Sequence, residues 1–359
     1  MSDYQDINPM SRAFPKKERT LGFWAGKVPA SYWTIGVILL FMPLFVSDFF
    51  LFQIWGWTFI LGTIALSLMF LAGYGGMVSL VQMTVAGVAG YMVAILGDSA
   101  ITDISQGWPW WVAIPLALII AMIFGTLTGW LAVRTEGIYT IMITLAIASA
   151  FFYFTRQNYV VFNGFQGFNG IFPPNLFGVD WRGPKAFYYL TLGVAAISYF
   201  AVFYVSRAPF GLALQGVRDN PRRMAALGFN VTAHRVAAYA FAALIAGVGG
   251  ILLTWQSAQI SPGTAGIGAV VDLLVIAIMG GLRRPIGAFV GAFIYVLLKT
   301  FAVDVLVSLG LAGERFNLLI GLIFLIIVFA SPDGVLGLWD KVKESRKKDP
   351  LLDRQGDAL

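Results

Sequence analysis

The stretch FYVSRAPFGLALQGVRDNPRRMAALGFNVTAHRVAAY, residues 203–239, decides how the rest of the chain is interpreted. It lies between two long apolar runs, and its polar part extends from Arg207 to Arg235. A polar, arginine-rich loop between apolar helices is typical of a docking surface in the water beside a membrane. The alternative is an interfacial helix that its arginines attract to anionic lipid.

Within this loop the sequence predicts a short helix over residues 222–227. Asn220 can cap it, Pro221 suits its first position, and Gly228 can end it. We expect the apolar side chains of this element to hold it against the neighbouring helices, so that it acts as a lever. These side chains are Met224, Leu227 and Phe229.

The composition places this loop in an integral membrane protein. Hydrophobic residues make up 58% of the 359 residues, charged residues only 12%, and the mean hydropathy is +0.79. A soluble domain cannot bury so much apolar surface, whereas a bilayer favours its exposure. We predict an all-α bundle with one transmembrane domain at 32–335, a coupling loop at 207–235, and tails at 1–31 and 336–359. There is no Cys, so disulfides, thiolate metal sites and a Cys nucleophile are excluded.

About ten transmembrane helices are expected, because a hydrocarbon core about 30 Å thick needs roughly 20 apolar residues per helix. The predicted spans are 32–48, 51–72, 77–97, 111–133, 138–156, 187–206, 236–256, 268–281, 286–307 and 316–331. Several are short, notably 268–281, so a count of eight or nine stays open.

The distribution of Lys and Arg predicts the orientation. With about ten spans, the basic tails, Arg134, the coupling loop and Arg283–Arg284 all fall on one side. Cytoplasmic loops carry an excess of positive charge, so both termini are expected in the cytoplasm. The exception is the basic segment 156–185, which falls on the side opposite the cytoplasm. It is long enough to form a small structure of its own.

Two glycine clusters interrupt the apolar segments. Gly73, Gly75 and Gly76 lie in FLAGYGGMVSL, and Gly280, Gly281, Gly287 and Gly291 lie in IMGGLRRPIGAFVGAF. Helix breaks at membrane depth are tolerated where protein or a water-filled cavity satisfies the backbone, so they are candidates for lining a path. The alternative is tight packing of helices at small residues, with an ordinary turn at the cytoplasmic end.

Few ionisable residues fall within the spans. Asp272, Lys299 and Asp304 are the main ones, and such residues are costly at membrane depth and point to function. The alternative is a structural ion pair or an anchor at a helix end. His234, the single histidine, lies in the basic loop, where a solvated position at a helix end is expected.

Catalytic and cofactor motifs are missing. No G-x-x-x-x-G-K-[ST] is present, so this chain cannot cradle ATP by a P-loop, and any energy from ATP must come from partner subunits. H-E-x-x-H, paired His and Cys ligands, and G-x-S-x-G are also absent. We therefore expect a protein that is not an enzyme and holds no cofactor and no metal in this chain.

The basic loop resembles the coupling segment of the LivM-type permeases of bacterial branched-chain amino acid ABC importers, whose pattern is G-x-x-L-x-A-I-R-D-x-x-x-x-A-x-x-L-G-x-x-V. The residues that carry the resemblance are Gly211, Leu214, Val217 in place of Ile, Arg218, Asp219, Ala225, Leu227, Gly228 and Val231. Four further stretches, GYGGMVSL, RTEGIYTIMITLA, NGFQGFNGI and IMGGLRRPIGAFVGA, are similar to family motifs in the same order. The resemblance covers about residues 35–340.

This resemblance implies a multi-pass permease of the bacterial inner membrane that works with a second, LivH-like permease, two cytoplasmic ATPases, a periplasmic substrate-binding protein and membrane lipid, and not with nucleic acid. It implies that Arg218, Asp219, Arg222, Arg223 and Gly228 couple the permease to the ATPases. The long loop at 157–184 would face the binding protein. The candidates for lining the translocation path are Gly73, Gly76, Ser79, Gln82, Thr144 and Asp272.

The solute is less well defined than the class. Gln82 stands where the family commonly has His, and Ser149 stands where it has an acidic residue. Permeases of this type also serve urea, amides and aromatic acids, but a branched-chain or other hydrophobic amino acid is the first expectation. A stand-alone secondary transporter, in which Asp272 and Lys299 handle a coupling ion, is the alternative from another class. A membrane enzyme is a third hypothesis.

Overall fold

The computed structural model describes residues 30–308 except 136, 176, 177, 179 and 283, together with 321, 322, 325, 334, 335 and 337. Of 30–35 and 302–308 only the backbone is described. The chain divides into two compact units, Met1–Val46 and Ser47–Leu359. The first contains α1 (Ala30–Phe41) and the 3-10 turn η2 (Met42–Leu44).

The second unit is built almost entirely from helices, which confirms the predicted all-α class. Its first span, Phe50–Tyr74, is continuous and comprises π-helical η3 (Phe50–Gly56), α2 (Trp57–Met69) and π-helical η4 (Phe70–Tyr74). The other elements before the coupling loop are α3 (Gln82–Leu96), α4 (Trp110–Ala132), α5 (Ile138–Gln157), α6 (Tyr159–Phe162), β1 (Phe168–Asn169) and α7 (Pro184–Arg207). From the loop onward they are α8 (Pro209–Asp219), α9 (Pro221–Ala226), α10 (Val231–Ser257), β2 (Gln259–Ile260), η5 (Pro262–Ala265), α11 (Ile267–Gly280) and α12 (Pro285–Ser308).

Within the described residues, five helices are long and apolar enough to cross a membrane. The predicted spans at 268–281 and 286–307 correspond to α11 and α12, which are bent by 117° and would make a sixth if they form one span. Helix α3 is apolar but has only 15 residues. The predicted span at 316–331 lies almost wholly outside the described residues, so the expected total of about ten stays a prediction.

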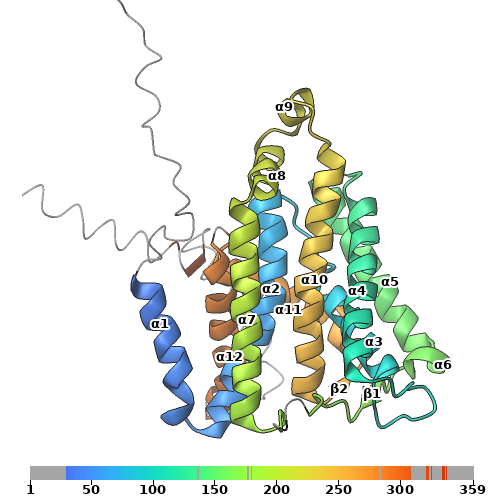
Figure 1. The fold of residues 1–359 in the computed structure, drawn as a ribbon, viewed down its shortest axis with the longest axis vertical. Helices are drawn as coiled ribbons and strands as arrows, with labels where there is room; N and C mark the ends of the chain where they lie inside the picture. The colour runs from blue at the N-terminus through green and yellow to red at the C-terminus, as the bar shows by residue number, and fades with distance from the viewer. Residues whose placement is uncertain are drawn as a thin grey trace, which may run out of the picture. The chain divides into compact units, whose positions relative to one another are not determined.

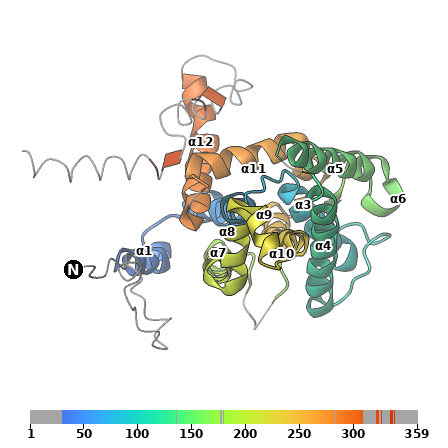
Figure 2. The same cartoon turned by 90° about the horizontal axis from the view of Figure 1, so that it is seen from above.

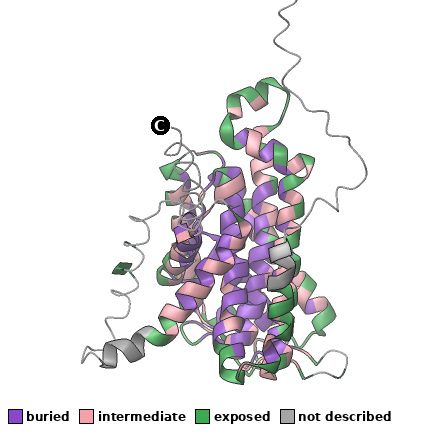
Figure 3. Ribbon diagram, turned by 90° about the vertical axis from the view of Figure 1, so that its left-hand side faces the viewer, coloured by how far each residue is buried: buried purple, intermediate pink, exposed green. Residues whose placement is uncertain are grey.

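Helix α10 lies at the centre of the second unit, packed against α2, α3 and α4 (Figures 1 and 2). In the apolar windows of the spans, 83% of the Phe50–Tyr74 residues are buried but only 22% of those in α5, so α5 presents most of its surface outward. The buried residues accordingly gather in the middle of the unit (Figure 3). Glycines allow these contacts: a Cβ at Gly250 would lie 2.1 Å from the Ala86 carbonyl oxygen.

The two ends of this bundle carry different structures. Helices α8 and α9 connect α7 to α10 at one end, and the β1–β2 pair lies at the opposite end (Figure 1). The pair is antiparallel, with Phe168 opposite Ile260 and Asn169 opposite Gln259. Of the segment 156–185, expected to be long enough for a small structure of its own, the structure shows α6 and β1, and β1 pairs with β2 outside the segment.

Candidate functional site

The coupling loop folds into two helices instead of the single predicted one. The Asn220 cap is confirmed, since its Oδ1 accepts a hydrogen bond from the Arg223 amide at 2.9 Å and Pro221 opens α9. Helix α8, which the sequence did not predict, precedes it over Pro209–Asp219. A second asparagine, Asn230, caps α10 through the Ala233 amide at 3.0 Å, so this helix begins at Val231, five residues before the predicted 236.

Helix α8 is the part of the loop that packs on the bundle. Its buried face consists of Gly211, Ala213, Leu214 and Val217. The side-chain Nε2 of Gln215 donates a hydrogen bond to the Ser206 carbonyl at 2.9 Å and so joins α8 to the end of α7. Helix α9 has no buried residue. The expectation that Leu227 holds the element in place was wrong, because its side chain is exposed; Phe229 is also exposed, but its ring contacts His234.

Of the three predicted anchors, Met224 alone is partly buried. It lies against α8, where a Cβ at Gly216 would approach its sulfur to 2.8 Å. The base of the turn is held by an aromatic cluster. The His234 ring stacks on Phe210 with a centroid distance of 5.7 Å and meets Phe229 edge-on at 5.6 Å. His234 therefore has a packing role at the start of α10.

Arg218 connects α8 to the first glycine break. Its Nη1 donates to the Gly73 carbonyl at 2.5 Å, and its Nε and Nη2 both bond the Asp219 carboxylate at 2.8 Å. The ion pair is exposed to solvent and adds little stability by itself. The contact with Gly73 joins residues 145 positions apart in the sequence and ties α8 to the end of η4.

Both glycine breaks meet at this point. Gly76 has φ +67°, and a Cβ there would lie 2.5 Å from the Arg218 Cγ, so a larger residue would displace the arginine. A Cβ at Gly73 would lie 2.4 Å from the carbonyl oxygen of Leu282, in the turn between α11 and α12. The structure thus brings Gly73 and Gly76, predicted as path residues, next to the predicted coupling residue Arg218.

The remaining coupling residues lie on the exposed side of α9. Arg222 and Arg223 are exposed, and Gly228 has φ +88°, a left-handed conformation that favours glycine. The Gly228 amide bonds the Ala225 carbonyl at 3.0 Å and the Phe229 amide bonds the Met224 carbonyl at 3.1 Å, which closes the helix end. The guanidinium groups of Arg222 and Arg223 are thus exposed on the short helix α9, which follows directly after α8.

Three of the predicted path residues, Ser79, Gln82 and Thr144, are fully buried close to the helix break before α3. The Leu80 amide donates to the Thr144 Oγ1 at 3.1 Å, which connects the non-helical segment before α3 to α5. The Ser67 hydroxyl donates to the Gln82 Oε1 at 3.3 Å, which connects α2 to α3. Among the described residues, the Gln82 Nε2 has no hydrogen-bond partner, whereas the Ser79 hydroxyl faces the Tyr239 hydroxyl.

Asp272 lies elsewhere, on α11 where that helix faces α12. Its half-buried carboxylate faces the hydroxyl of Tyr295, which is close enough to donate a hydrogen bond. Lys299 is exposed, with its Nζ 5.9 Å from the centre of the Tyr295 ring. Within the part of the chain that the structure describes, no ion pair joins Asp272 to Lys299. The side chain of Asp304 lies outside the described residues.

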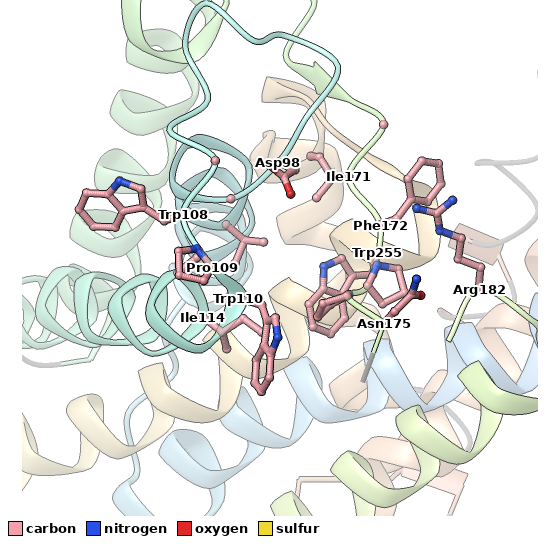
Figure 4. Close-up of a pocket in the computed structure, with 17 residues that line it drawn as sticks. Asp98, Trp108, Pro109, Trp110, Ile114, Ile171, Phe172, Asn175, Arg182 and Trp255 are labelled. Atoms are coloured by element: carbon pink, nitrogen blue, oxygen red, sulfur yellow. The ribbon is translucent and has the colours of Figure 1, made fainter. Parts of the chain in front are cut away.

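A cavity at the opposite end of the bundle was not predicted from the sequence. It has a volume of about 460 Å³ and lies between the ends of α3, α4 and α10 and the segment before α7 (Figure 4). Its walls include Asp98, Trp108, Trp110, Phe172, Arg182 and Trp255. The run GWPWW at 107–111, rich in Trp and Pro, is the sequence signal that marks this wall of the cavity.

No metal centre accompanies these sites: across the described residues, no group of three or more His, Cys, Asp or Glu side chains is placed to hold an ion. The coupling end and the cavity are instead joined by long apolar helices. This arrangement defines a polytopic helical membrane protein with a short exposed helix, α9, at one end.

Comparison with known proteins identifies the family. The chain belongs to the family of branched-chain amino acid transport system permease components, whose model matches residues 50–328. The chain is 22% identical over 287 residues to the high-affinity branched-chain amino acid transport system permease protein LivM of Salmonella typhimurium, a match covering 74% of this chain and 66% of that protein. It is 29% identical over 147 residues to a probable LivH permease of Methanocaldococcus jannaschii, covering 38% and 44% of the two chains.

A third relative is the nucleoside ABC transporter permease protein NupC of Lactococcus lactis, 29% identical over 118 residues, covering 32% of this chain and 35% of that protein. The chain thus spans slightly less than two thirds of the length of the LivM relative. These relatives are named as transport permeases and not as enzymes. No solved structure matches the chain.

Proposed function

We propose that this chain is a permease subunit of an ATP-binding cassette importer that moves branched-chain or other hydrophobic amino acids across the bacterial inner membrane. The observation that carries the proposal is the helix pair α8 and α9. Helix α9 exposes arginines to water, and Arg218 of α8 donates a hydrogen bond to the Gly73 carbonyl at the end of η4. A chain without a P-loop needs such an element to receive work from partner ATPases.

The contacts of α8 define a route for that work. A displacement of α8 moves Gly73 through its hydrogen bond with Arg218. Because Gly73 packs against the Leu282 carbonyl, it also moves the turn between α11 and α12. It also reaches the break before α3, because Gly76 lies against Arg218. The two helix breaks therefore move with the docking element, as a switch between two packed arrangements requires.

The partners and the orientation belong to the same proposal. Two cytoplasmic ATPases bind the α8–α9 surface through Arg218, Asp219, Arg222, Arg223 and the turn at Gly228. A second, LivH-like permease completes the membrane part, and a periplasmic binding protein docks near 157–184. Both termini are cytoplasmic, which agrees with the described basic side chains Arg134 and Arg207 at the same end as α8.

The path is proposed to run past the buried polar residues Ser79, Gln82 and Thr144. The Gln82 Nε2, which has no hydrogen-bond partner among the described residues, offers a hydrogen bond to a passing solute or to water. Gly73 and Gly76 stay in this proposal because their helix break moves during the switch. Asp272 stays in it because its charge moves with α11. The N-terminal unit 1–46 and the segment after 308 are assigned no role in the path.

The test is transport by the complete complex in proteoliposomes. We expect uptake of tritiated L-leucine that requires the binding protein and ATP and persists after ionophores collapse all ion gradients. Uptake driven by an ion gradient in the chain alone would establish a secondary transporter instead. Competition by unlabelled phenylalanine, urea, acetamide and uridine identifies the solute class, because only the true solute class competes at low concentration.

The absence of cysteine makes the orientation directly testable. A single cysteine replacing Ser345, in the C-terminal tail, is expected to react with an impermeant maleimide only when the cytoplasmic side is open. A cysteine replacing Ser105, in the loop after α3, is the matched probe for the opposite side. Labelling of the Ser345 position from outside intact cells contradicts the proposed topology.

A further inference from the structure

The cavity beneath the loops offers two opposite charges that are not paired with each other. Asp98 and Arg182 both line it, and the ion pairs within the described residues do not include either side chain. The Arg182 guanidinium is held over the Phe172 ring at 4.2 Å, and the Asp98 carboxylate lies near Gly107, whose Cβ would be 3.5 Å from Oδ1. Figure 4 shows the two groups on different parts of the wall.

Aromatic rings lie around the same cavity. Trp108 comes from the loop that leads into α4, Trp110 is the first residue of α4, and Trp255 comes from the last turn of α10. Trp255 also packs against both clusters of buried apolar side chains, so it connects the cavity to the interior of the bundle. A volume of about 460 Å³ lies within the roughly 300–1,000 Å³ of small-molecule sites.

The position of the cavity sets the side from which it fills. Helix α7 ends at α8, and α10 begins after α9, so Arg182 before α7 and Trp255 at the end of α10 lie at the opposite face. Because α3, α4 and α10 each contribute an end to the wall, a change in their packing changes the shape of the cavity. A solute held there is held by the parts that move in transport.

We propose that this cavity is a receiving site for a zwitterionic amino acid with an apolar side chain, and this inference rests on the proposed function. Arg182 binds the carboxylate, Asp98 binds the ammonium group, and Trp108, Trp110 and Trp255 contact the side chain. Charge-assisted hydrogen bonds recognise the two charged groups, which share the Cα of the ligand, and the aromatic rings favour its apolar side chain. The permease then selects its solute a second time after the binding protein has released it.

The experiment measures binding of tritiated L-leucine to the complete complex in lipid nanodiscs without ATP and without the binding protein. Two probes each lack one charge: 3-methylbutylamine has no carboxylate, and 4-methylpentanoate has no ammonium group. We expect both to bind at least about tenfold more weakly than leucine, the loss of one partly solvated charge-assisted contact.

Two variants assign the charges. Arg182→Gln is expected to weaken leucine binding about tenfold while leaving 3-methylbutylamine binding unchanged, and Asp98→Asn the reverse with 4-methylpentanoate. The matched controls are Arg156→Gln, whose guanidinium rests on Phe165 outside the cavity, and Asp103→Asn in the same loop as Asp98. Both controls are expected to bind all three probes like the wild type.

The outcomes separate this inference from the proposed function. If ATP-driven leucine uptake is normal but Arg182→Gln and Asp98→Asn bind leucine like the wild type, the receiving site is refuted and the importer stands. If these variants reduce only the affinity of the binding protein for the complex, the cavity is a docking surface and the inference is wrong. If the complex transports no hydrophobic amino acid, the proposed function fails, whatever the cavity binds.

Discussion

The end of the bundle that carries α8 and α9 is held by few contacts, whereas the end that carries the cavity is fastened by its backbone. Helix α9 has no buried residue, and α8 reaches the first glycine break through Arg218. At the opposite end, hydrogen bonds of 2.8 Å join Gln106 to Ile95, Trp108 to Leu96 and Ala100 to Asn169. The contrast is one of attachment: the α8–α9 end is joined to the rest of the second unit by fewer contacts than the cavity end.

Replacing Gly76 by valine is expected to have the largest effect on this contrast. A β-branched residue at φ +67° is strained by about 1–3 kcal/mol, and its Cβ collides with the Arg218 side chain. ATP-driven leucine uptake should fall about 50-fold or more, while leucine binding to the ATP-free complex stays within twofold. The control is Gly193→Val in α7, where a Cβ meets nothing within 4 Å. Equal losses in both variants would show that Gly76 has no special place in coupling.

Arg218→Ala should lower ATP-driven uptake about tenfold, because α8 loses its bond to the Gly73 carbonyl. Lysine should not restore uptake, since one ammonium group cannot bond Gly73 and Asp219 in the geometry of the guanidinium. Capture of leucine by the binding protein should stay unchanged. Arg134→Ala is the control, because that guanidinium lies over Trp130 at 3.9 Å at the same end but outside α8. Wild-type uptake in Arg218→Ala would contradict the route from α8 to the helix breaks.

Gly228→Ala tests whether the turn after α9 matters for docking alone. The left-handed conformation at φ +88° costs alanine about 1–2 kcal/mol, but nothing lies within 4 Å of the new Cβ. We expect several-fold slower uptake and a weaker affinity for the ATPases, with a small loss of thermal stability that matches the loss in the control variant. Gly137→Ala has a similar strain at φ +61° in equally open space at the start of α5. If both variants slow uptake alike, strain and not docking explains the effect.

Thr144→Val should have the smallest effect on transport and a measurable effect on stability. It leaves the buried Leu80 amide without its partner at 3.1 Å, a loss of about 1–3 kcal/mol. Thermal unfolding of the purified complex should occur at a lower temperature, with uptake reduced less than in the Arg218 variant. Thr126→Val is the control, because its hydroxyl bonds the Met122 carbonyl within its own helix. An unchanged unfolding temperature would show that this bond does not hold the segment before α3.

Sequence reasoning succeeded where the signal was local. The apolar runs at 111–133 and 138–156 became α4 and α5 within one residue at each end, because a continuous apolar helix is set by its own composition. The Asn220 cap with Pro221 also formed as predicted. The same reasoning failed at Leu227, which is exposed, since apolar character does not say which neighbour a side chain meets.

By itself the sequence determined a membrane-spanning chain of apolar helices, a basic loop between two of them and the absence of a P-loop. The tertiary structure alone decided that Arg218 meets Gly73 and Gly76, that Asp272 faces Tyr295 instead of Lys299, and that Asp98 and Arg182 share a cavity. Composition, periodicity and capping depend on residues within a few turns of each other. Contacts such as Arg218 with Gly73, 145 residues apart, depend on how the helices pack, which no local pattern specifies.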